Sequence, residues 1–160
     1  MTGRPVAVFD LDGTLADVRH RLRHLRRRPP DWDAFFAAAP DDPPLAEGVA
    51  LALEHAATSD LAYVTGRPAR CRRDTATWPT RHGLPAGALL MRADGDRRPA
   101  RIAKPRLLAR LARDRAVSVV VDDDQRVCDA YEDAGFHVVR ATWMTAPTLL
   151  ERAQEEQGRT

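Results

Sequence analysis

The sequence predicts a three-layer α/β/α protein with a doubly wound parallel sheet of about five strands. Short apolar stretches rich in β-branched residues alternate with helix-like stretches along the 160 residues, and this alternation is typical of βαβ units. Three of the predicted strands end in polar residues, and in such sheets ligands bind at the carboxyl ends of the strands. A chain of this length is expected to form a single domain, residues 1–160, around one core.

The first strand is followed by the longest segment without a predicted strand. Residues 5–10 (PVAVFD) are apolar and β-branched, which predicts a short buried strand. Residues 16–44 follow as a small insertion, whose arginine-rich first part stops at two consecutive prolines. Its second part, residues 31–39 (DWDAFFAAA), predicts a short helix with Asp31 or Asp33 near its cap.

The middle of the chain alternates between helix and strand. Apolar residues at helical spacing predict a helix over residues 45–58, and residues 61–67 (LAYVTGR) predict a strand that runs into a Thr-Gly turn. Residues 68–82 predict a second helix, which Pro79 is expected to end or kink. Residues 88–96 (ALLMRADGD) predict a short third strand followed by a polar loop.

The last third of the chain is expected to repeat this alternation. Its predicted elements are a helix, a strand, a helix, a strand and a fraying helical tail, over residues 99–113, 117–124, 125–135, 136–141 and 146–160. Pro105 is expected to set a boundary or a kink near Lys104 in the first of these helices. Gly135 is expected to cap the end of the second.

The composition is that of an ordinary globular protein. Apolar residues make up 44% of the chain and charged residues 30%, and the longest apolar runs fall far short of the roughly 20 residues that span a bilayer. We therefore expect no membrane association and, because the amino-terminal apolar run is too short for a signal peptide, a cytoplasmic location. Cys71 and Cys128 lie far apart without metal-ligand spacing, so both are expected to be reduced. The net charge is only +2, yet residues 19–28 hold six arginines and two histidines.

Polar residues gather where three of the predicted strands end. The residues at the ends of the first, second and fourth strands are Asp10, Asp12, Thr65, Gly66, Arg67, Asp122, Asp123 and Asp124. A single aspartate after a strand is often a turn residue or a helix cap, but three such ends at one edge indicate a site. Clustered carboxylates repel one another unless a cation lies between them, and oxygen ligands favour Mg²⁺.

Asp10 and Asp12 are two residues apart, so in an extended strand their side chains point to the same side. One carboxylate can attack phosphorus and form an aspartyl-phosphate, and the other can protonate the leaving oxygen and later take a proton from water. The hydroxyl, the glycine turn and the cation at residues 65–67 suit a phosphoryl group. The residues alone therefore favour Mg²⁺-dependent phosphoryl chemistry.

Four stretches resemble the motifs of the haloacid dehalogenase-like phosphohydrolases: DLDGT, VTGR, Lys104 and VVDDD. VTGR, LLMRADGDRR followed by Lys104, and VVDDDQRVCDAYEDAGFHVV are further similar to the phosphatase half of phage and bacterial polynucleotide kinase-phosphatases, which remove 3′-phosphates from nucleic-acid ends. The resemblance runs from about Val6 to Trp143. It implies a haloacid dehalogenase-like Rossmannoid fold. Many relatives have a large cap domain that selects small substrates. Neither the segment after the first motif nor the segment after the second motif is long enough to form one.

The resemblance implies a role for each residue at the strand ends. Asp10 would be the nucleophile and Asp12 the acid and base, while Lys104 would neutralise both the nucleophile and the transferring phosphate. The residues implied to hold Mg²⁺ and its waters are Asp10, Asp12 through its backbone carbonyl, Asp122 and Asp123. The residues implied to bind the phosphoryl group and the substrate are Thr65, Gly66, Arg67 and Arg21. Lys104 is the only lysine among 25 lysines and arginines. In a chain that otherwise uses arginine, this favours a position where a compact ammonium group fits and a wide guanidinium group does not.

One arginine matches the family with competitors, and two other positions depart from it. Arg21 matches by its distance from the first motif, with Arg19 and Arg23 as close competitors. Ala100 stands where the family usually has an acid that helps to position the lysine, so a retuned or weakened site is expected. Asp124 replaces a basic residue of the family's fourth motif.

An open site suits a large substrate, so DNA or RNA ends are the expected substrates, with small phosphomonoesters as the alternative. The arginines of residues 19–28 either contact the phosphate backbone or form a solvated helix. Trp32, Phe35 and Phe36 either stack a base or pack the insertion onto the core. No GxxxxGK[ST] phosphate loop occurs in the sequence, so a 5′-kinase or a ligase would be a separate chain.

Two alternative functions remain beside a polynucleotide 3′-phosphatase. The first is a small-molecule phosphatase such as a nucleotidase on the same scaffold. The second is a non-catalytic module that binds nucleic-acid ends. The presence of Asp10, Asp12, Lys104 and Asp122 disfavours the second alternative.

Overall fold

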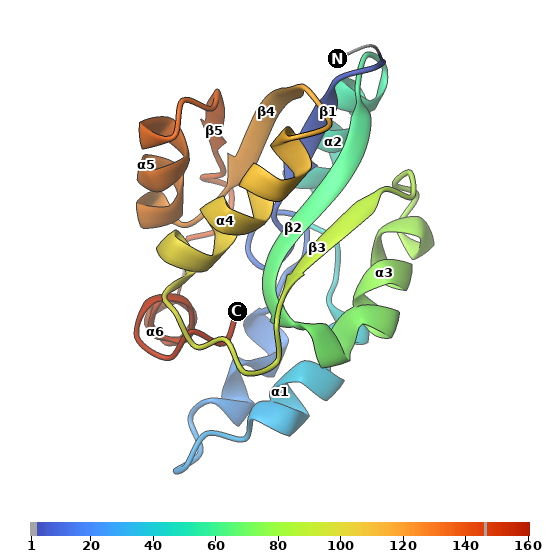
Figure 1. Cartoon of the computed structure of the whole chain (residues 1–160). Helices are drawn as coiled ribbons and strands as arrows, with labels where there is room; N and C mark the ends of the chain where they lie inside the picture. Colours follow the sequence, from blue (N-terminus) through green and yellow to red (C-terminus); the bar gives the residue numbers. More distant parts are fainter. Residues whose placement is uncertain (1–2, 146) are drawn as a thin grey trace.

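The computed structural model describes residues 3–145 and 147–160, and its centre is a parallel sheet of five strands (Figure 1). The strands are β1 (Val6–Phe9), β2 (Asp60–Pro68), β3 (Ala88–Arg92), β4 (Val117–Asp122) and β5 (Val138–Arg140). They lie in the order β3-β2-β1-β4-β5. The chain therefore adds β2 and β3 on one side of β1 and then β4 and β5 on the other side. This order confirms the predicted doubly wound α/β/α architecture.

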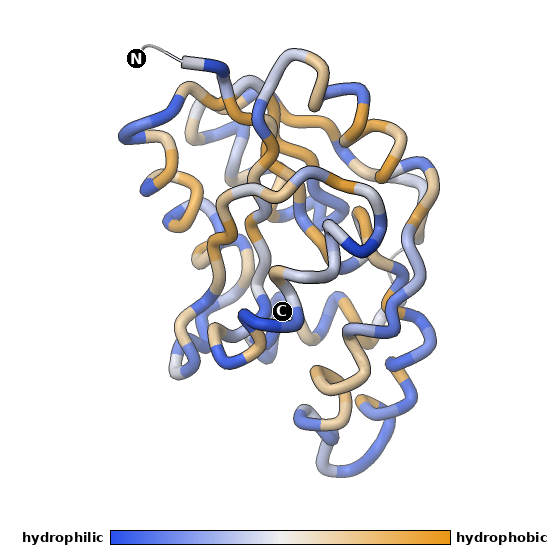
Figure 2. The backbone as a smooth tube through the Cα atoms, turned by 90° about the vertical axis from the view of Figure 1, so that its right-hand side faces the viewer, coloured by the Kyte–Doolittle hydropathy of each residue, from blue (hydrophilic) through white to orange (hydrophobic). Residues whose placement is uncertain are grey.

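Helices cover both faces of the sheet. They are α1 (Trp32–Ala37), α2 (Ala46–Ala56), α3 (Arg72–Arg81), α4 (Ala100–Ala112), α5 (Gln125–Asp133) and α6 (Thr148–Glu155). Alternate side chains of a strand point to opposite faces, so Ala7 and Phe9 of β1 pack with α2 and α3, and Val6 and Val8 pack with α4 and α5. Figure 2, which colours the chain by residue hydropathy, shows hydrophobic stretches in the interior and hydrophilic stretches in the outer loops. In the described part of the chain, no helix is both long and apolar enough to cross a membrane.

The segment after β1 and the end of the chain share a third apolar cluster. A 3₁₀ helix (Arg19–His24) precedes α1, and its Leu22 is buried with Phe35 of α1 and with Leu150 and Ala153 of α6. The insertion is thus fastened to the body of the protein by α6. Over the described residues, no large cap domain covers the strand ends.

Several element ends follow from local hydrogen bonds that the sequence signals. The Asp31 carboxylate accepts from the Ala34 N–H at 3.0 Å and caps α1, as one of the two predicted aspartates. The Asp124 carboxylate accepts from the Arg126 N–H at 3.0 Å and caps α5. Gly135 has φ +89° immediately after α5, which confirms the predicted glycine cap. The departure from the family at Asp124 therefore supplies a helix cap.

Two prolines lie inside helices, and neither ends its helix; a kink at either proline stays a prediction. α3 continues past Pro79 to Arg81, and α4 begins at Ala100 and runs through Pro105 without ending there. A proline removes one backbone hydrogen bond, but burial of the neighbouring side chains, such as Trp78 in α3, keeps the helix intact.

The prediction of a fraying tail is wrong. Leu150 and Ala153 of α6 are fully buried, and Thr160 is only 3% exposed. Figures 1 and 2 both show the carboxyl terminus against the body of the protein. The tail is ordered because the apolar face of α6 completes the cluster of the insertion, which no local pattern reveals. Residue 146, the first of the predicted tail, lies outside the described residues.

Candidate active site

The carboxyl ends of β1 and β4 lie side by side where the winding of the sheet reverses. The backbone N–H of Asp10 donates to the carbonyl of Val121 at 2.9 Å, which aligns the two strand ends. Asp10 and Asp12 follow β1, while Asp122 ends β4 and Asp123 comes next. In doubly wound sheets this reversal point is where ligands bind.

Three buried carboxylates meet at this point. Asp10, Asp122 and Asp123 each offer an oxygen, and these oxygens lie within 4.8 Å of one another. Burial first and the charge of Asp10 second raise the pKa of Asp122 to about 7. Burial together with the charges of Asp10 and Asp122 raises the pKa of Asp123 well above its ordinary value. Among the described residues, Asp123 Oδ2 finds no hydrogen-bond partner, and an unpartnered buried oxygen beside two more carboxylates fits a divalent metal ion.

The two residues after Asp12 make room for this cluster and hold it. Gly13 has φ +84°, and a β-carbon at this position would lie 2.2 Å from Asp123 Oδ2. The Thr14 hydroxyl donates to Asp10 Oδ2 at 3.1 Å and lies 3.5 Å from Asp123 Oδ1. Lack of space therefore explains the glycine of the first motif, and hydrogen bonding to the carboxylates explains its threonine.

Lys104 reaches the cluster from α4. Its Nζ donates to Asp10 Oδ1 and to Asp122 Oδ2, each at 2.8 Å. Burial by itself lowers the pKa of Lys104, but attraction to Asp10 and Asp122 outweighs burial and raises the pKa well above its ordinary value. Ala100, one turn earlier, is buried among apolar residues. The lysine is thus positioned by two acids of the site, without an acid at residue 100.

Asp12 faces two buried arginines and a hydroxyl. Its Oδ1 accepts from Arg21 Nη2 at 2.9 Å and from Arg67 Nε at 3.0 Å, and its Oδ2 accepts from the Thr160 hydroxyl at 2.6 Å. Burial raises the pKa of Asp12, but the charges of Arg67 and Arg21 outweigh it and hold this pKa well below its usual range. In this arrangement Asp12 is an ionised acceptor.

Of the three candidate arginines in the insertion, Arg21 is the one that reaches the site. It is fully buried, and its guanidinium lies 4.3 Å from the centre of the Phe35 ring. Arg19 instead pairs with Asp17 at the surface, with 2.6 Å between Arg19 Nη2 and Asp17 Oδ2, and Arg23 is exposed.

Asp42 joins the site although no sequence pattern points to it. Its carboxylate accepts from Arg21 Nε and Nη2, both at 2.8 Å, and from Arg67 Nη2 at 3.2 Å. His20 Nε2 lies 2.7 Å from the same carboxylate. Asp42 therefore links both arginines that face Asp12, from a loop (PDDPP) whose sequence indicates only a turn.

The end of β2 brings Thr65 and Gly66 to the same edge. The Thr65 hydroxyl accepts from the Arg67 N–H at 3.2 Å, and Arg92 Nε donates to the Gly66 carbonyl at 2.8 Å. A β-carbon on Gly66 would lie 2.1 Å from the carbonyl carbon of Thr160. Thr160 thus covers the turn that was predicted to bind the phosphoryl group. Sequence analysis identifies neither Thr160 nor Arg92, although Arg92 ends its strand as Asp122 does.

A family model of the polynucleotide kinase PNKP phosphatase domain matches residues 4–142. A search of curated protein sequences finds no match.

Solved structures resemble the fold over most of this chain. A chain of the Pnkp1/Rnl/Hen1 RNA repair complex has a TM-score of 0.71 and 21% identity, over 88% of this chain and 43% of its own length. The class C acid phosphatase from Bacillus anthracis has a TM-score of 0.62 and 16% identity, over 89% of this chain and 69% of its own. The haloacid dehalogenase-like family protein SP0104 from Streptococcus pneumoniae has a TM-score of 0.61 and 14% identity, over 98% and 93%. This chain therefore spans less than half of the repair-complex chain that it matches.

Proposed function

Because this chain belongs to the polynucleotide kinase PNKP phosphatase domain family, within the haloacid dehalogenase-like phosphatases, we propose that it removes 3′-phosphates from polynucleotide ends. The observation that carries the proposal is the buried Lys104 between Asp10 and Asp122, at 2.8 Å from each. With Arg21 and Arg67 facing Asp12, this edge combines a nucleophile, a proton carrier and cations. That combination suits transfer of a phosphoryl group.

In the proposed first step, Asp10 attacks the phosphorus of the terminal phosphate. A bond forms between its carboxylate oxygen and phosphorus while the bond between phosphorus and the 3′ oxygen breaks. Asp12, which is ionised in the free enzyme, takes up a proton from solvent as substrate binds. It gives this proton to the 3′ oxygen, which leaves as the 3′-hydroxyl. Arg21 and Arg67, which pair with Asp12 in this structure, turn to the phosphoryl oxygens when substrate binds, and this frees Asp12 to carry the proton.

In the second step, water releases the phosphoryl group from Asp10. Asp12 takes a proton from the water molecule, whose oxygen attacks phosphorus, and the bond between phosphorus and Asp10 breaks. Inorganic phosphate leaves and Asp10 returns as a carboxylate. Throughout, Lys104 offsets the charge of Asp10, and Thr65 and Gly66 bind the phosphoryl oxygens.

We propose that Mg²⁺ is held by Asp10, Asp122, Asp123 and the backbone carbonyl of Asp12. The unpartnered Oδ2 of Asp123 and the repulsion within the carboxylate cluster support this assignment. When bound, Mg²⁺ offsets the negative charge of the cluster and polarises a phosphoryl oxygen.

A polynucleotide end is favoured over a small metabolite by the surroundings of the site. Over the described residues no large cap domain encloses it, and Arg26, Arg27 and Arg28 are exposed on the insertion nearby. Arginines that contact backbone phosphates make binding strong at low salt and weaker at high salt. A nucleotidase-like phosphatase, which acts on small phosphomonoesters, is the alternative.

The partners follow from the same proposal. The chain matches only part of its relative in the RNA repair complex, and its sequence holds no Walker-type phosphate loop. We propose that a kinase or a ligase activity acts on the same DNA or RNA ends.

Replacing the nucleophile tests the chemistry. Asp10→Asn keeps the size of the side chain but removes the attacking oxygen anion, so Mg²⁺-dependent release of phosphate from a 3′-phosphorylated oligonucleotide is expected to vanish. An acid-quenched wild-type reaction is expected to show one phosphoryl group on the protein by intact mass, and the variant none. Residual turnover by the variant at the wild-type rate would refute Asp10 as the nucleophile.

A further inference from the structure

A cleft of about 750 Å³ opens on the insertion between the side chains of Trp32, Arg27, Arg28, Arg70 and Arg159, and we call it the Trp32 cleft. Four of these five side chains are cationic. Arg27 pairs with Asp31 and Arg70 with Asp33, at 3.2 and 3.3 Å, on the exposed side. Within the described residues, neither Arg28 nor Arg159 has an ion-pair partner. The cleft therefore carries uncompensated positive charge.

The floor of the cleft is aromatic. Trp32 is half-buried and stacks on Phe36, whose ring centre lies 6.1 Å away, while the ring of Phe35 meets it edge-on at 5.9 Å. Phe35 and Phe36 are themselves buried, so they pack the insertion, as one of their two predicted roles requires. Trp32 differs from them because it is only half-buried and lines the cleft. The Arg159 guanidinium, a flat cation, lies 5.0 Å from the ring centre.

Two segments of the chain connect the cleft to the active site. Arg159 is followed by Thr160, whose hydroxyl donates to Asp12. Arg70 comes three residues after Arg67, which also donates to Asp12. Two arginines of the cleft therefore lie within three residues of side chains that contact Asp12.

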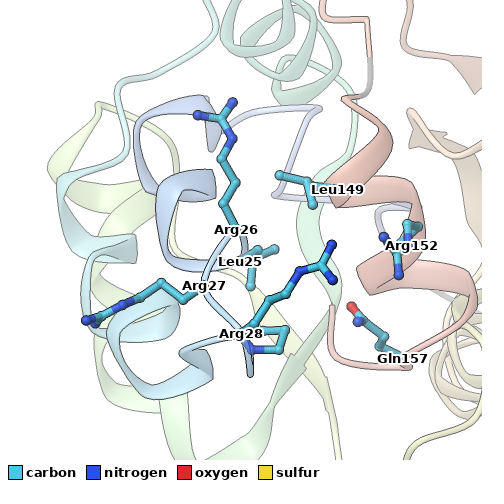
Figure 3. Close-up of a pocket in the computed structure, with 8 residues that line it drawn as sticks. Leu25, Arg26, Arg27, Arg28, Leu149, Arg152 and Gln157 are labelled. Carbon is cyan, nitrogen blue, oxygen red and sulfur yellow. The ribbon is translucent and has the colours of Figure 1, made fainter.

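The positive surface continues past the turn formed by residues 26–28. A second cleft, of about 420 Å³, lies between this turn and α6 and is lined by Arg26, Arg28 and Arg152 (Figure 3). Figure 3 shows Arg28 pointing toward Arg152, whereas Arg27 points to the opposite side of the turn. Arg27 and Arg28 thus line both clefts.

We propose that the Trp32 cleft holds the nucleotides that precede the terminal phosphate of a single-stranded polynucleotide. One base stacks on Trp32 in place of the Arg159 guanidinium, and backbone phosphates contact Arg27 and Arg28. Aromatic stacking together with arginines along a groove is how proteins hold single strands without reading their sequence. This assignment rests on the proposed function, because it takes the substrate to be a polynucleotide end.

The test is a binding measurement with fluorescently labelled DNA and RNA single strands of about ten nucleotides that end in a 3′-hydroxyl. Trp32→Leu keeps the apolar packing on Phe36 but removes the flat ring, so the Kd is expected to rise about tenfold for at least one of the two sugars. Trp32→Phe restores a stacking face and is expected to recover most of the affinity. The Arg27→Ala, Arg28→Ala double variant is expected to raise the Kd. The slope of log affinity against log salt concentration is expected to become less steep, by about 0.7 for each lost phosphate contact.

Arg110→Ala is the matched control, because Arg110 is an exposed arginine of α4 outside both clefts. Its Kd is expected to equal that of the wild type, and thermal unfolding checks that every variant is folded. A wild type that binds neither strand, or cleft variants that bind as Arg110→Ala does, would overturn the inference. Release of phosphate from a 3′-phosphorylated strand is measured in parallel. Cleft-dependent binding without release contradicts only the proposed function, and release with no effect of the cleft variants contradicts only the cleft.

Discussion

Asp42 shows how much of this site depends on a residue that does not itself lie at a strand end. Its buried carboxylate lies 2.8 Å from Arg21 Nε and 3.2 Å from Arg67 Nη2, and so sets the direction from which both guanidinium groups face Asp12. A buried ion pair adds little net stability as a whole, but loss of one partner leaves the other charged and buried. Asp42 is therefore a positioning residue for the two arginines.

Asp42→Asn is expected to lower the free energy of unfolding by about 3–5 kcal/mol, because Arg21 and Arg67 lose a buried counter-charge. It is also expected to raise the KM for a 3′-phosphorylated oligonucleotide about tenfold, with a smaller change in kcat, since the two arginines are proposed to bind substrate and carry no proton. Urea unfolding and steady-state kinetics measure the two effects. Asp17→Asn is the control, because Asp17 pairs with the exposed Arg19 and is expected to change little. A lower free energy of unfolding with an unchanged KM would mean that Asp42 stabilises the fold but does not position the arginines for substrate.

Asp123→Asn is expected to stabilise the metal-free protein, by about 1 kcal/mol, as functional sites often trade stability for activity. The substitution removes one of three crowded carboxylates and keeps the volume. Saturating Mg²⁺ is expected to raise the thermal midpoint of the wild type, by mass action on the folded state, and to raise that of the variant much less. Equal Mg²⁺-dependent shifts in both proteins would contradict the metal assignment.

At the scale of residues, the sequence identifies those side chains that follow strands and misses those that arrive from elsewhere. Asp10 and Asp122 are visible because an apolar run stops at an acid. Asp42 lies in a loop, and Thr160 lies 148 residues from the Asp12 that it contacts. Only the packed insertion and α6 bring these two residues to the site.

At the scale of elements, the segment after α6 is the part that differs most from expectation. Thr160 donates to Asp12 at 2.6 Å and covers the turn at Gly66, while the Arg159 N–H donates to the Ala153 carbonyl at 2.9 Å. Thr160 thus lies where the leaving group and the phosphoryl oxygens are proposed to bind. We expect any phosphomonoester, small or polynucleotide, to displace it.

Removal of residues 157–160 is expected to raise kcat/KM for p-nitrophenyl phosphate about tenfold, because one hydrogen bond to a buried ionised group no longer has to be broken. α6 keeps its buried Leu150 and Ala153, so the thermal midpoint is expected to change little. Thr160→Ser, which retains the donating hydroxyl, serves as the control and is expected to match the wild type. Slower turnover after the removal would mean that the segment takes part in the working site.

The helices show which local sequence signals predict a helix end. Asp31 and Gly135 mark their helix ends because capping is local chemistry. Pro79 and Pro105 do not end their helices, because packing of α3 and α4 on the sheet overrides the loss of a single backbone hydrogen bond. The sequence therefore predicts helix caps better than it predicts whether a proline ends a helix.

At the scale of the whole molecule, the order of strands explains why the site could be predicted in outline. Strands of a parallel sheet are buried on both faces and appear as apolar runs, so all five are visible in the sequence. Their shared direction places Asp10, Thr65 and Asp122 at one edge. The basic surface around this edge was not predictable in the same way, because Arg28, Arg70 and Arg159 come from three separate segments.

The most direct test of the central claim compares a polynucleotide end with its mononucleotide. We expect kcat/KM for a 3′-phosphorylated single strand to exceed that for a nucleoside 3′-monophosphate at least about tenfold, since one stacked base alone contributes about 1–3 kcal/mol. The measurement is phosphate release in the presence of Mg²⁺, with DNA and RNA strands in parallel. Equal or faster turnover of the mononucleotide would contradict a polynucleotide 3′-phosphatase and would favour a nucleotidase.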